Sequence, residues 1–227
     1  MKFQFFFCSI LVIGVLLTAC KTEPEKKSDS FEPVSNGMVI NSSPREVESY
    51  VSGSQGNELR IGWNIQGHAM RAFLSFDVSS ILPAEDEEMT IDRAVLKVYE
   101  SNTNLHPFDG DDETRTVEVA LLDYGTLSGN DFDREITTAC GTIAEWGYST
   151  LEEHSLTVTN ILSDLYSLDP ANLSQVQFRL QFTDDDNITD LNNSVLDGSM
   201  WNIFAVEEGG DYVPVLEINY TISEKDD

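Results

Sequence analysis

The stretch RAFLSFDV, Arg71 to Val78, decides the fold, because its residues alternate at the period of a β-strand. Successive side chains of a strand point to opposite faces, which sets Ala72, Leu74, Phe76 and Val78 against Arg71, Phe73, Ser75 and Asp77. Arg71 and Asp77 then lie roughly 20 Å apart, at about 3.3 Å per residue, and do not pair with each other. We expect each to bond a neighbouring segment, Asp77 through the backbone N–H groups of the turn DVSS. The alternative is a catalytic carboxylate at Asp77.

Short alternating runs separated by turn-rich stretches continue along the chain, as is typical of an all-β protein. We expect an antiparallel β-sandwich of the jelly-roll type with about nine strands. These are residues 47–52, 59–63, 71–78, 92–101, 116–124, 154–159, 176–183, 201–206 and 213–222. The apolar spacing of TNILSDLYSL, residues 159–168, predicts one short helix with Thr159 or Asn160 as its N-cap.

Composition bounds the number of domains and the kinds of partner. The chain of 227 residues is 41% hydrophobic, enough for one sizeable all-β domain. Forty acidic residues against thirteen basic ones give a net charge of −27. Nucleic acids and polyanionic membrane surfaces are bound by clusters of Lys and Arg, so this composition argues against both. A composition shift at about Val39 predicts one domain over residues 39–222, followed by an acidic tail, residues 223–227.

The N-terminus, MKFQFFFCSILVIGVLLTACK, has one early Lys and then an apolar run from Phe3 to Ala19. Such a run at this position is typical of a secretory signal peptide, here residues 1–19. An ordinary cleavage site before Cys20 would need a small residue where Leu17 stands, whereas LTAC, residues 17–20, resembles a bacterial lipobox. The resemblance implies that Cys20 carries acyl chains such as palmitate and holds the protein to a membrane without spanning it. The alternative is an uncleaved anchor.

Residues 20–38 continue as KTEPEKKSDSFEPVSNG after Cys20, without apolar periodicity, and predict a flexible tether. We therefore expect an extracytoplasmic protein on a bacterial membrane, which is the outer membrane or cell surface in a Gram-negative host. Cys8 would leave with the signal peptide, so Cys140 has no intrachain disulfide partner. Cys140 is either a small buried thiol, the interpretation we favour, or a nucleophile.

The succession ESYVSGSQGNELRIGW, RAFLSFDVSSIL, IDRAVLKVYE and VPVLEINYT resembles the DNRLRE-type domains of bacterial surface proteins over most of residues 47–221. The matching framework positions are Arg71, Leu74, Phe76, Asp77, Ala94, Leu96, Tyr99, Pro214, Leu216 and Tyr220. The resemblance implies a jelly-roll module related to carbohydrate-binding modules, commonly attached to polysaccharide-active or cell-wall proteins. NDFDREITTACGTIAEWG, residues 130–147, replaces the family's Trp- and Pro-containing central segment, so the resemblance assigns no ligand residue.

Sugar recognition uses flat aromatic faces beside hydrogen-bonding groups, because a pyranose presents C–H bonds on one face and hydroxyls around its edge. The candidate ligand-binding residues are Trp63, Trp146, Tyr148 and Trp201. Trp146 and Tyr148 flank Gly147 and form the best exposed pair, while Trp side chains also commonly belong to the core. His68 and His106 stand beside Gly67 and Pro107 and are expected only to solvate loops.

Two acidic stretches have the hard oxygen ligands that Ca²⁺ prefers. The candidate metal ligands are Asp184, Asp186 and Asp190 in TDDDNITDLNN, and FDGDDETR, residues 108–115, is a second acidic stretch. Neither fits an EF-hand, and the alternative in each case is a solvated acidic turn. Scattered His and Cys residues offer no zinc-ligand spacing. A structural Ca²⁺ is therefore the one cofactor that the sequence suggests.

Enzyme motifs are missing from the sequence, which has no G-x-S-x-G elbow, no H-E-x-x-H and no Gly-rich phosphate loop. We expect a lipid-anchored, non-catalytic module that binds carbohydrate at the cell surface. One alternative is a structural or adhesive lipoprotein that docks a protein partner of the envelope. The other is a small polysaccharide lyase or hydrolase.

Overall fold

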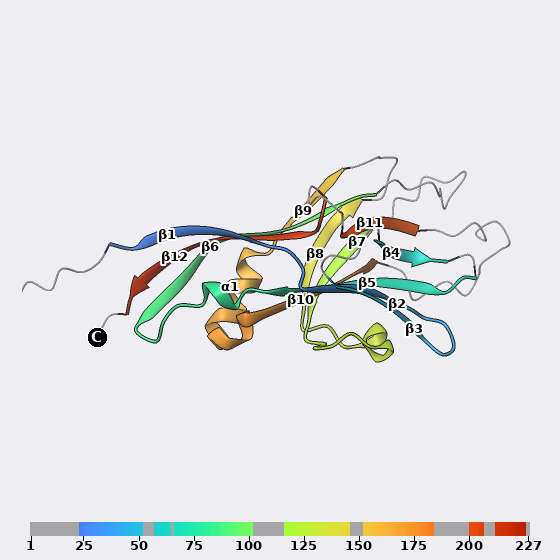
Figure 1. The fold of residues 1–227 in the computed structure, drawn as a ribbon, viewed down its shortest axis with the longest axis horizontal. Helices are drawn as coiled ribbons and strands as arrows, with labels where there is room; N and C mark the ends of the chain where they lie inside the picture. The colour runs from blue at the N-terminus through green and yellow to red at the C-terminus, as the bar shows by residue number, and fades with distance from the viewer. Residues whose placement is uncertain are drawn as a thin grey trace, which may run out of the picture.

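In the computed structural model, described for residues 23–51, 57–64, 66–101, 116–145, 152–183, 200–206 and 212–225, the chain is built mainly of β-strands (Figure 1). The strands are β1 Glu25–Phe31, β2 Ser35–Ile40, β3 Glu46–Val51, β4 Asn57–Trp63, β5 Ala69–Asp77, β6 Glu87–Tyr99, β7 Thr116–Leu122, β8 Thr138–Glu145, β9 Glu153–Thr157, β10 Gln175–Phe182, β11 Met200–Val206 and β12 Val215–Glu224. The helix α1 spans Thr159–Leu168, and three short 3-10 helices are η1 Ser79–Ile81, η2 Gly129–Asp133 and η3 Pro170–Ser174.

The strands form two sheets, and every pair between described strands is antiparallel. The smaller sheet has the order β1-β12-β6-β9. The larger sheet has the order β11-β4-β5-β10-β7-β8. Outside this order, β2 pairs with β5 and also with β3. The predicted all-β sandwich with one helix is confirmed, and the described residues form twelve strands where about nine were expected.

The apolar core lies between the sheets and is centred on β5. Ala72, Leu74 and Phe76 of this strand are fully buried, as the alternation of RAFLSFDV predicts. Phe76 meets Phe178 of β10 edge to face, with ring centroids 6.1 Å apart. The core face of β5 therefore behaves as an ordinary strand of a sandwich.

The opposite face of β5 is buried as well, which alternation alone does not predict. Arg71 is 3% exposed, and Phe73 and Ser75 are inaccessible. Residues 123–137, which connect β7 to β8 and include η2, lie over this face, and we call them the covering segment. Figure 1 shows η2 outside the layer that contains β2, β3 and β5. β5 therefore has neighbouring strands along both of its edges and is also covered on both of its faces.

The covering segment is held chiefly through its backbone. Gln177 of β10 accepts hydrogen bonds from the N–H groups of Tyr124 (2.7 Å) and Gly125 (3.0 Å), and it donates to the Gly125 carbonyl (2.9 Å). Arg71 and Arg179 both donate to the carbonyl of Phe132. These bonds satisfy backbone groups that an irregular segment packed on a sheet would otherwise leave without partners.

The ring of Phe132 is the apolar anchor of the covering segment. It is 1% exposed and contacts two guanidinium groups, with Arg71 Cζ 4.1 Å and Arg45 Cζ 5.2 Å from its centroid. Such cation–π contacts let a charged side chain pack against an aromatic face. Burial raises the pKa of the nearby Tyr124 hydroxyl, and the negative charge of Asp131 adds to the shift.

Arg71 and Asp77 therefore serve the fold at separate places, as their spacing predicts. Asp77 Oδ1 accepts from the backbone N–H of Ser79 at 3.0 Å and from its hydroxyl at 2.6 Å. These two bonds lower the pKa of the Asp77 carboxyl and close the turn into η1. The expectation that Asp77 would bond the backbone of DVSS is confirmed.

The N-terminal boundary of the domain differs from the prediction. Residues 25–38, expected in the flexible tether, form β1 and the start of β2. β1 is exposed along most of its length, but it pairs with β12 over seven residues, and the Tyr220 hydroxyl donates to Asp29 at 2.7 Å. A strand that adds to an existing sheet edge gains its order from backbone hydrogen bonds, so it needs no apolar periodicity of its own.

The C-terminal boundary also lies beyond the predicted residue 222. β12 extends to Glu224, and the N–H of Lys225 donates to the Asp86 carbonyl at 3.0 Å, so the acidic tail begins later than residue 223.

Among the described helices, none is long and apolar enough to cross a membrane.

Three strands and one helix cap depart from the prediction. β1, β2 and β8 lie outside the expected strands, and β8 pairs with β7 through two register shifts that break its alternation. The helix spans the predicted residues, but its N-cap is Val158 rather than Thr159 or Asn160. The Thr159 hydroxyl instead accepts from the N–H of Ala94 at 2.8 Å and fastens α1 to β6.

Replacing Phe132 by Ala should lower the free energy of unfolding by about 4 kcal/mol, because the change removes a buried aromatic ring and its contacts with two guanidinium groups. Urea unfolding followed by circular dichroism measures this loss. Ile136→Ala on the same segment is the control, since Ile136 is exposed and should cost less than about 1 kcal/mol. Equal losses for the two variants would contradict the role of Phe132 as the anchor.

Candidate functional site

The structure removes one of the four aromatic ligand candidates. Trp63 is 1% exposed and stacks on Phe182, with ring centroids 5.6 Å apart, so it belongs to the core and the prediction of a ligand role is wrong. Trp146 and Tyr148 lie outside the described residues. Trp201 lies in β11 opposite Ile61, and its side chain is outside the described part of the chain.

The proposed metal and lipid positions also lie outside the described residues. These are Asp184, Asp186, Asp190, the whole acidic stretch at residues 108–115, His106 and Cys20. Within the described ranges, no three His, Cys, Asp or Glu side chains gather closely enough to hold a metal ion. His68 lies between β4 and β5, where its N–H donates to Asn64 Oδ1 at 2.9 Å in a turn.

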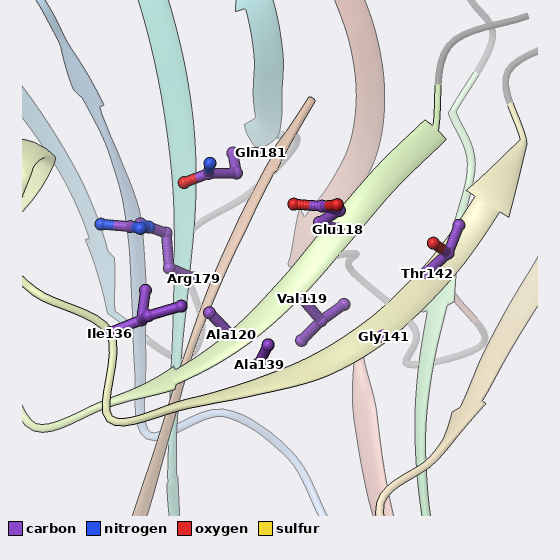
Figure 2. Close-up of a pocket in the computed structure, with 9 residues that line it drawn as sticks. All are labelled: Glu118, Val119, Ala120, Ile136, Ala139, Gly141, Thr142, Arg179 and Gln181. Carbon is purple, nitrogen blue, oxygen red and sulfur yellow. The ribbon is translucent and has the colours of Figure 1, made fainter. Parts of the chain in front are cut away.

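A shallow hollow of about 120 Å³ lies on the outer face of the larger sheet, and we call it the sheet hollow (Figure 2). Its lining residues come from three adjacent strands and from the covering segment. They are Glu118, Val119, Ala120, Ile136, Ala139, Gly141, Thr142, Arg179 and Gln181.

A row of three polar residues crosses the strands at one side of the sheet hollow. Gln181 of β10 is paired directly with Glu118 of β7, and Glu118 is paired with Thr142 of β8. Figure 2 shows the three side chains beside the small residues of the hollow. Neighbouring strands lie about 4.8 Å apart, so hydrogen-bonding groups recur along this row at about that spacing.

Small residues make the floor of the sheet hollow. Arg179 is paired with Ala120, and Ala120 with Ala139, which forms the next row across the same strands. Two methyl side chains between longer neighbours leave the space that the hollow occupies. Arg179 and Ile136 border the hollow on the side away from Thr142 (Figure 2).

Arg179 is held in place before any ligand arrives. It is 6% exposed, and its Nη1 donates to the carbonyls of Arg134 at 2.9 Å and Phe132 at 3.2 Å. Gln181 differs, since its Oε1 is buried and has no hydrogen-bond partner among the described residues. A buried amide oxygen without a partner loses hydration free energy, so the Gln181 side chain is less well satisfied than that of Arg179.

Two other hollows occur in the described part of the chain. A larger groove of about 470 Å³ lies between the C-terminal end of α1 and the ends of β7 and β10, and we call it the helix-end groove. A small acidic hollow of about 110 Å³ lies where β1 begins and β12 ends, and it is lined by Glu23, Glu25, Glu87, Ile222, Ser223 and Glu224.

Sequence reasoning did not identify the sheet hollow, because its residues look like ordinary positions of separate strands. Gln181 stands within VQFRLQFT, a stretch that was predicted correctly as a strand. The signal that marks the site is the cross-strand register, which pairs Gln181, Glu118 and Thr142, and no local pattern encodes a register.

The chain matches no protein-family model, and no curated protein matches it in sequence.

Cys140 lies in β8 beside the sheet hollow, packed partly against the core. Burial raises the pKa of its thiol to about 11. A thiol with a raised pKa is mostly protonated near neutral pH, which opposes a nucleophilic role.

The rate of Cys140 alkylation by iodoacetamide at pH 8 should be on the order of a hundredfold lower in the folded chain than in urea, because the thiolate fraction falls with the raised pKa. The measurement uses a soluble chain that begins at Lys21, in which Cys140 is the remaining thiol. A folded-state rate within about tenfold of the unfolded rate would instead support the nucleophile interpretation.

Proposed function

We propose that this protein is a non-catalytic, lipid-anchored module that binds neutral carbohydrate at the cell surface, with the sheet hollow as its binding site. The observation that carries the proposal is the cross-strand row of Gln181, Glu118 and Thr142 beside the fixed guanidinium of Arg179. This row offers donors and acceptors together, since it combines an amide, a carboxylate and a hydroxyl.

The chemistry of the row suits hydroxyl groups better than charged ligands. A sugar hydroxyl both donates and accepts, so it can bond a carboxylate, an amide and a guanidinium at the same time. The spacing of about 4.8 Å between strands is close to the length of one sugar ring. At about 120 Å³ the hollow would seat the edge of a ring rather than enclose it, which suits an extended glycan lying on the sheet.

Two further arguments favour binding without catalysis. Glycoside hydrolysis needs a pair of carboxyl groups across the scissile bond, and Glu118 is the one carboxylate among the described residues that line the hollow. The resemblance to DNRLRE-type domains points in the same direction, since such modules are related to carbohydrate-binding modules.

Aromatic stacking would come from Trp146 and Tyr148. Trp146 directly follows Glu145, the last residue of β8, and β8 forms one side of the sheet hollow. The proposal assigns these two residues to the sugar face because of this position in the sequence. The acidic candidates Asp184, Asp186 and Asp190 would hold a structural Ca²⁺ in the proposed function.

The anchor in this proposal is Cys20, lipidated on the outer side of a bacterial membrane. Because β1 begins at Glu25, the five peptide steps between Cys20 and β1 would span at most roughly 18 Å. The domain would therefore stand close to the bilayer. β1 begins near the place where β12 ends (Figure 1), and residues of both segments line the acidic hollow. Proximity to the bilayer limits reach, so the ligand would be a glycan of the same cell envelope or one delivered to it.

On an array of neutral glycans, the soluble domain should bind a defined set of structures, and Gln181→Leu should weaken that binding about tenfold by removing the amide from the row. Trp146→Ala should also weaken it, because the change removes an aromatic stacking face. Thr90→Val is the control, because Thr90 is an exposed residue of the other sheet. Repeating the array with EDTA tests the role of calcium.

Binding that survives Gln181→Leu would remove the sheet hollow from the proposal. New reducing ends or unsaturated products released from a polysaccharide would favour the enzymatic alternative, and capture by envelope proteins alone would favour the protein-docking alternative.

Labelled palmitate should be incorporated into the full-length chain in a bacterial host, and Cys20→Ser should abolish the label and release the protein from the membrane fraction. Cys140→Ser is the matched control, since it removes a cysteine that the proposal does not acylate, and it should leave the label unchanged. Label that persists in the Cys20→Ser variant would contradict the anchor.

A further inference from the structure

The helix-end groove is the largest of the hollows described above, and the glycan proposal does not use it. Its volume of about 470 Å³ falls in the range of ligand-binding clefts. Its lining comes from α1, η3, β7, β10 and both ends of the covering segment, which are Asp123 and Thr137. The question is which ligand chemistry this lining fits.

One wall of the groove is aliphatic and extends beyond the protein's own core. Ile161, Leu165 and Leu168 follow one another at helical spacing on α1, so they form one ridge. Ile161 and Leu165 pack against the core, whereas Leu168 is 82% exposed at the groove. Leu168 is therefore accessible to a binding partner, and Leu121 and Leu122 line the same groove.

The charge of the groove is negative. Among the described residues that line it, Asp123 is the one charged residue, and none is Lys or Arg. Arg134 donates to the Asp123 carbonyl, but its Nε is paired with Asp131 at 2.6 Å, which offsets its charge. The C-terminal end of a helix also carries partial negative charge, and α1 ends at Leu168 beside the groove. A ligand with positive charge is therefore favoured.

The remaining lining suits peptide groups. Asn172 and Gln175 carry carboxamides, each with the same donor and acceptor atoms as a peptide bond. Gln175 Nε2 donates to Ser75 at 3.0 Å, which fixes its orientation. An open groove with oriented amides, an aliphatic wall and one carboxylate matches the features by which grooves recognise peptide segments.

We propose that the helix-end groove binds a basic peptide segment that carries aliphatic side chains, supplied by a protein partner. The aliphatic side chains pack on Leu165 and Leu168, and the basic side chains face Asp123 and the end of α1. This site shares no lining residue with the sheet hollow, so it stands independently of the glycan proposal. The protein would then hold a protein partner at one surface and a glycan at another.

The test measures binding of a fluorescein-labelled peptide of alternating lysine and leucine by anisotropy, in about 0.15 M salt to screen long-range attraction. The soluble chain that begins at Lys21 should bind it saturably, and a peptide of alternating glutamate and leucine should not bind. Leu168→Asp should weaken binding at least about tenfold, although it makes the protein more acidic, because it removes the aliphatic contact. Leu168 is 82% exposed, so this variant should fold normally.

The matched charge variants are Asp123→Asn in the groove and Asp92→Asn on the exposed surface of β6, each removing one negative charge. Asp123→Asn should weaken binding several-fold and Asp92→Asn should leave it unchanged. Equal or tighter binding by Leu168→Asp, equal effects of the two Asp variants, or no binding by the unmodified chain would overturn the proposal. Leu168-dependent sedimentation with anionic lipid vesicles would also overturn it in favour of a lipid surface.

The glycan array separates this proposal from the previous one. Leu168→Asp should keep the glycan signal and lose the peptide, whereas Gln181→Leu should keep the peptide and lose the glycan. Loss of both activities in either variant would contradict the independence of the two sites.

Discussion

The structure depends on the burial of β5 from both sides. Its core face is apolar and packs in the usual way of a sandwich, but its other face carries Arg71 and Ser75, which need partners once water is excluded. The Phe132 carbonyl of the covering segment accepts from Arg71 and the Phe132 ring supplies the apolar contact, while Gln175 and Gln177 of β10 donate to Ser75. Without these bonds, the irregular covering segment would leave its own carbonyl groups unsatisfied. The central strand and the covering segment therefore specify each other.

This constraint also builds the sheet hollow. Arg179 is fixed by the carbonyls of Phe132 and Arg134, so the same bonds that hold the covering segment also orient the guanidinium beside Ala120 and Ala139. A preorganised donor loses less conformational entropy on binding than a mobile one. The proposed binding surface is thus a consequence of how the fold satisfies its buried polar groups, and its rigidity is inherited from the core.

The sequence predicted what depends on local periodicity. RAFLSFDV identified the central strand and its core face, and TNILSDLYSL identified α1 with its bounds. It did not predict β1, because EKKSDSF gains its order from pairing with β12, a partner almost two hundred residues away in the chain. The same limit explains Trp63, whose burial depends on stacking against Phe182, and the row containing Gln181, which depends on register. Contacts set by long-range pairing leave no local signature.

The covering segment also connects the two proposed binding surfaces. Ile136 lines the sheet hollow, while Asp123 and Thr137, at the two ends of the same segment, line the helix-end groove. Gln177 holds one end through the backbone of Tyr124 and Gly125, and Arg179 holds the other end through Arg134. A segment pinned at both ends transmits little displacement, because each surface is attached separately to β10. The two surfaces are therefore built by one structural element and yet can be occupied independently.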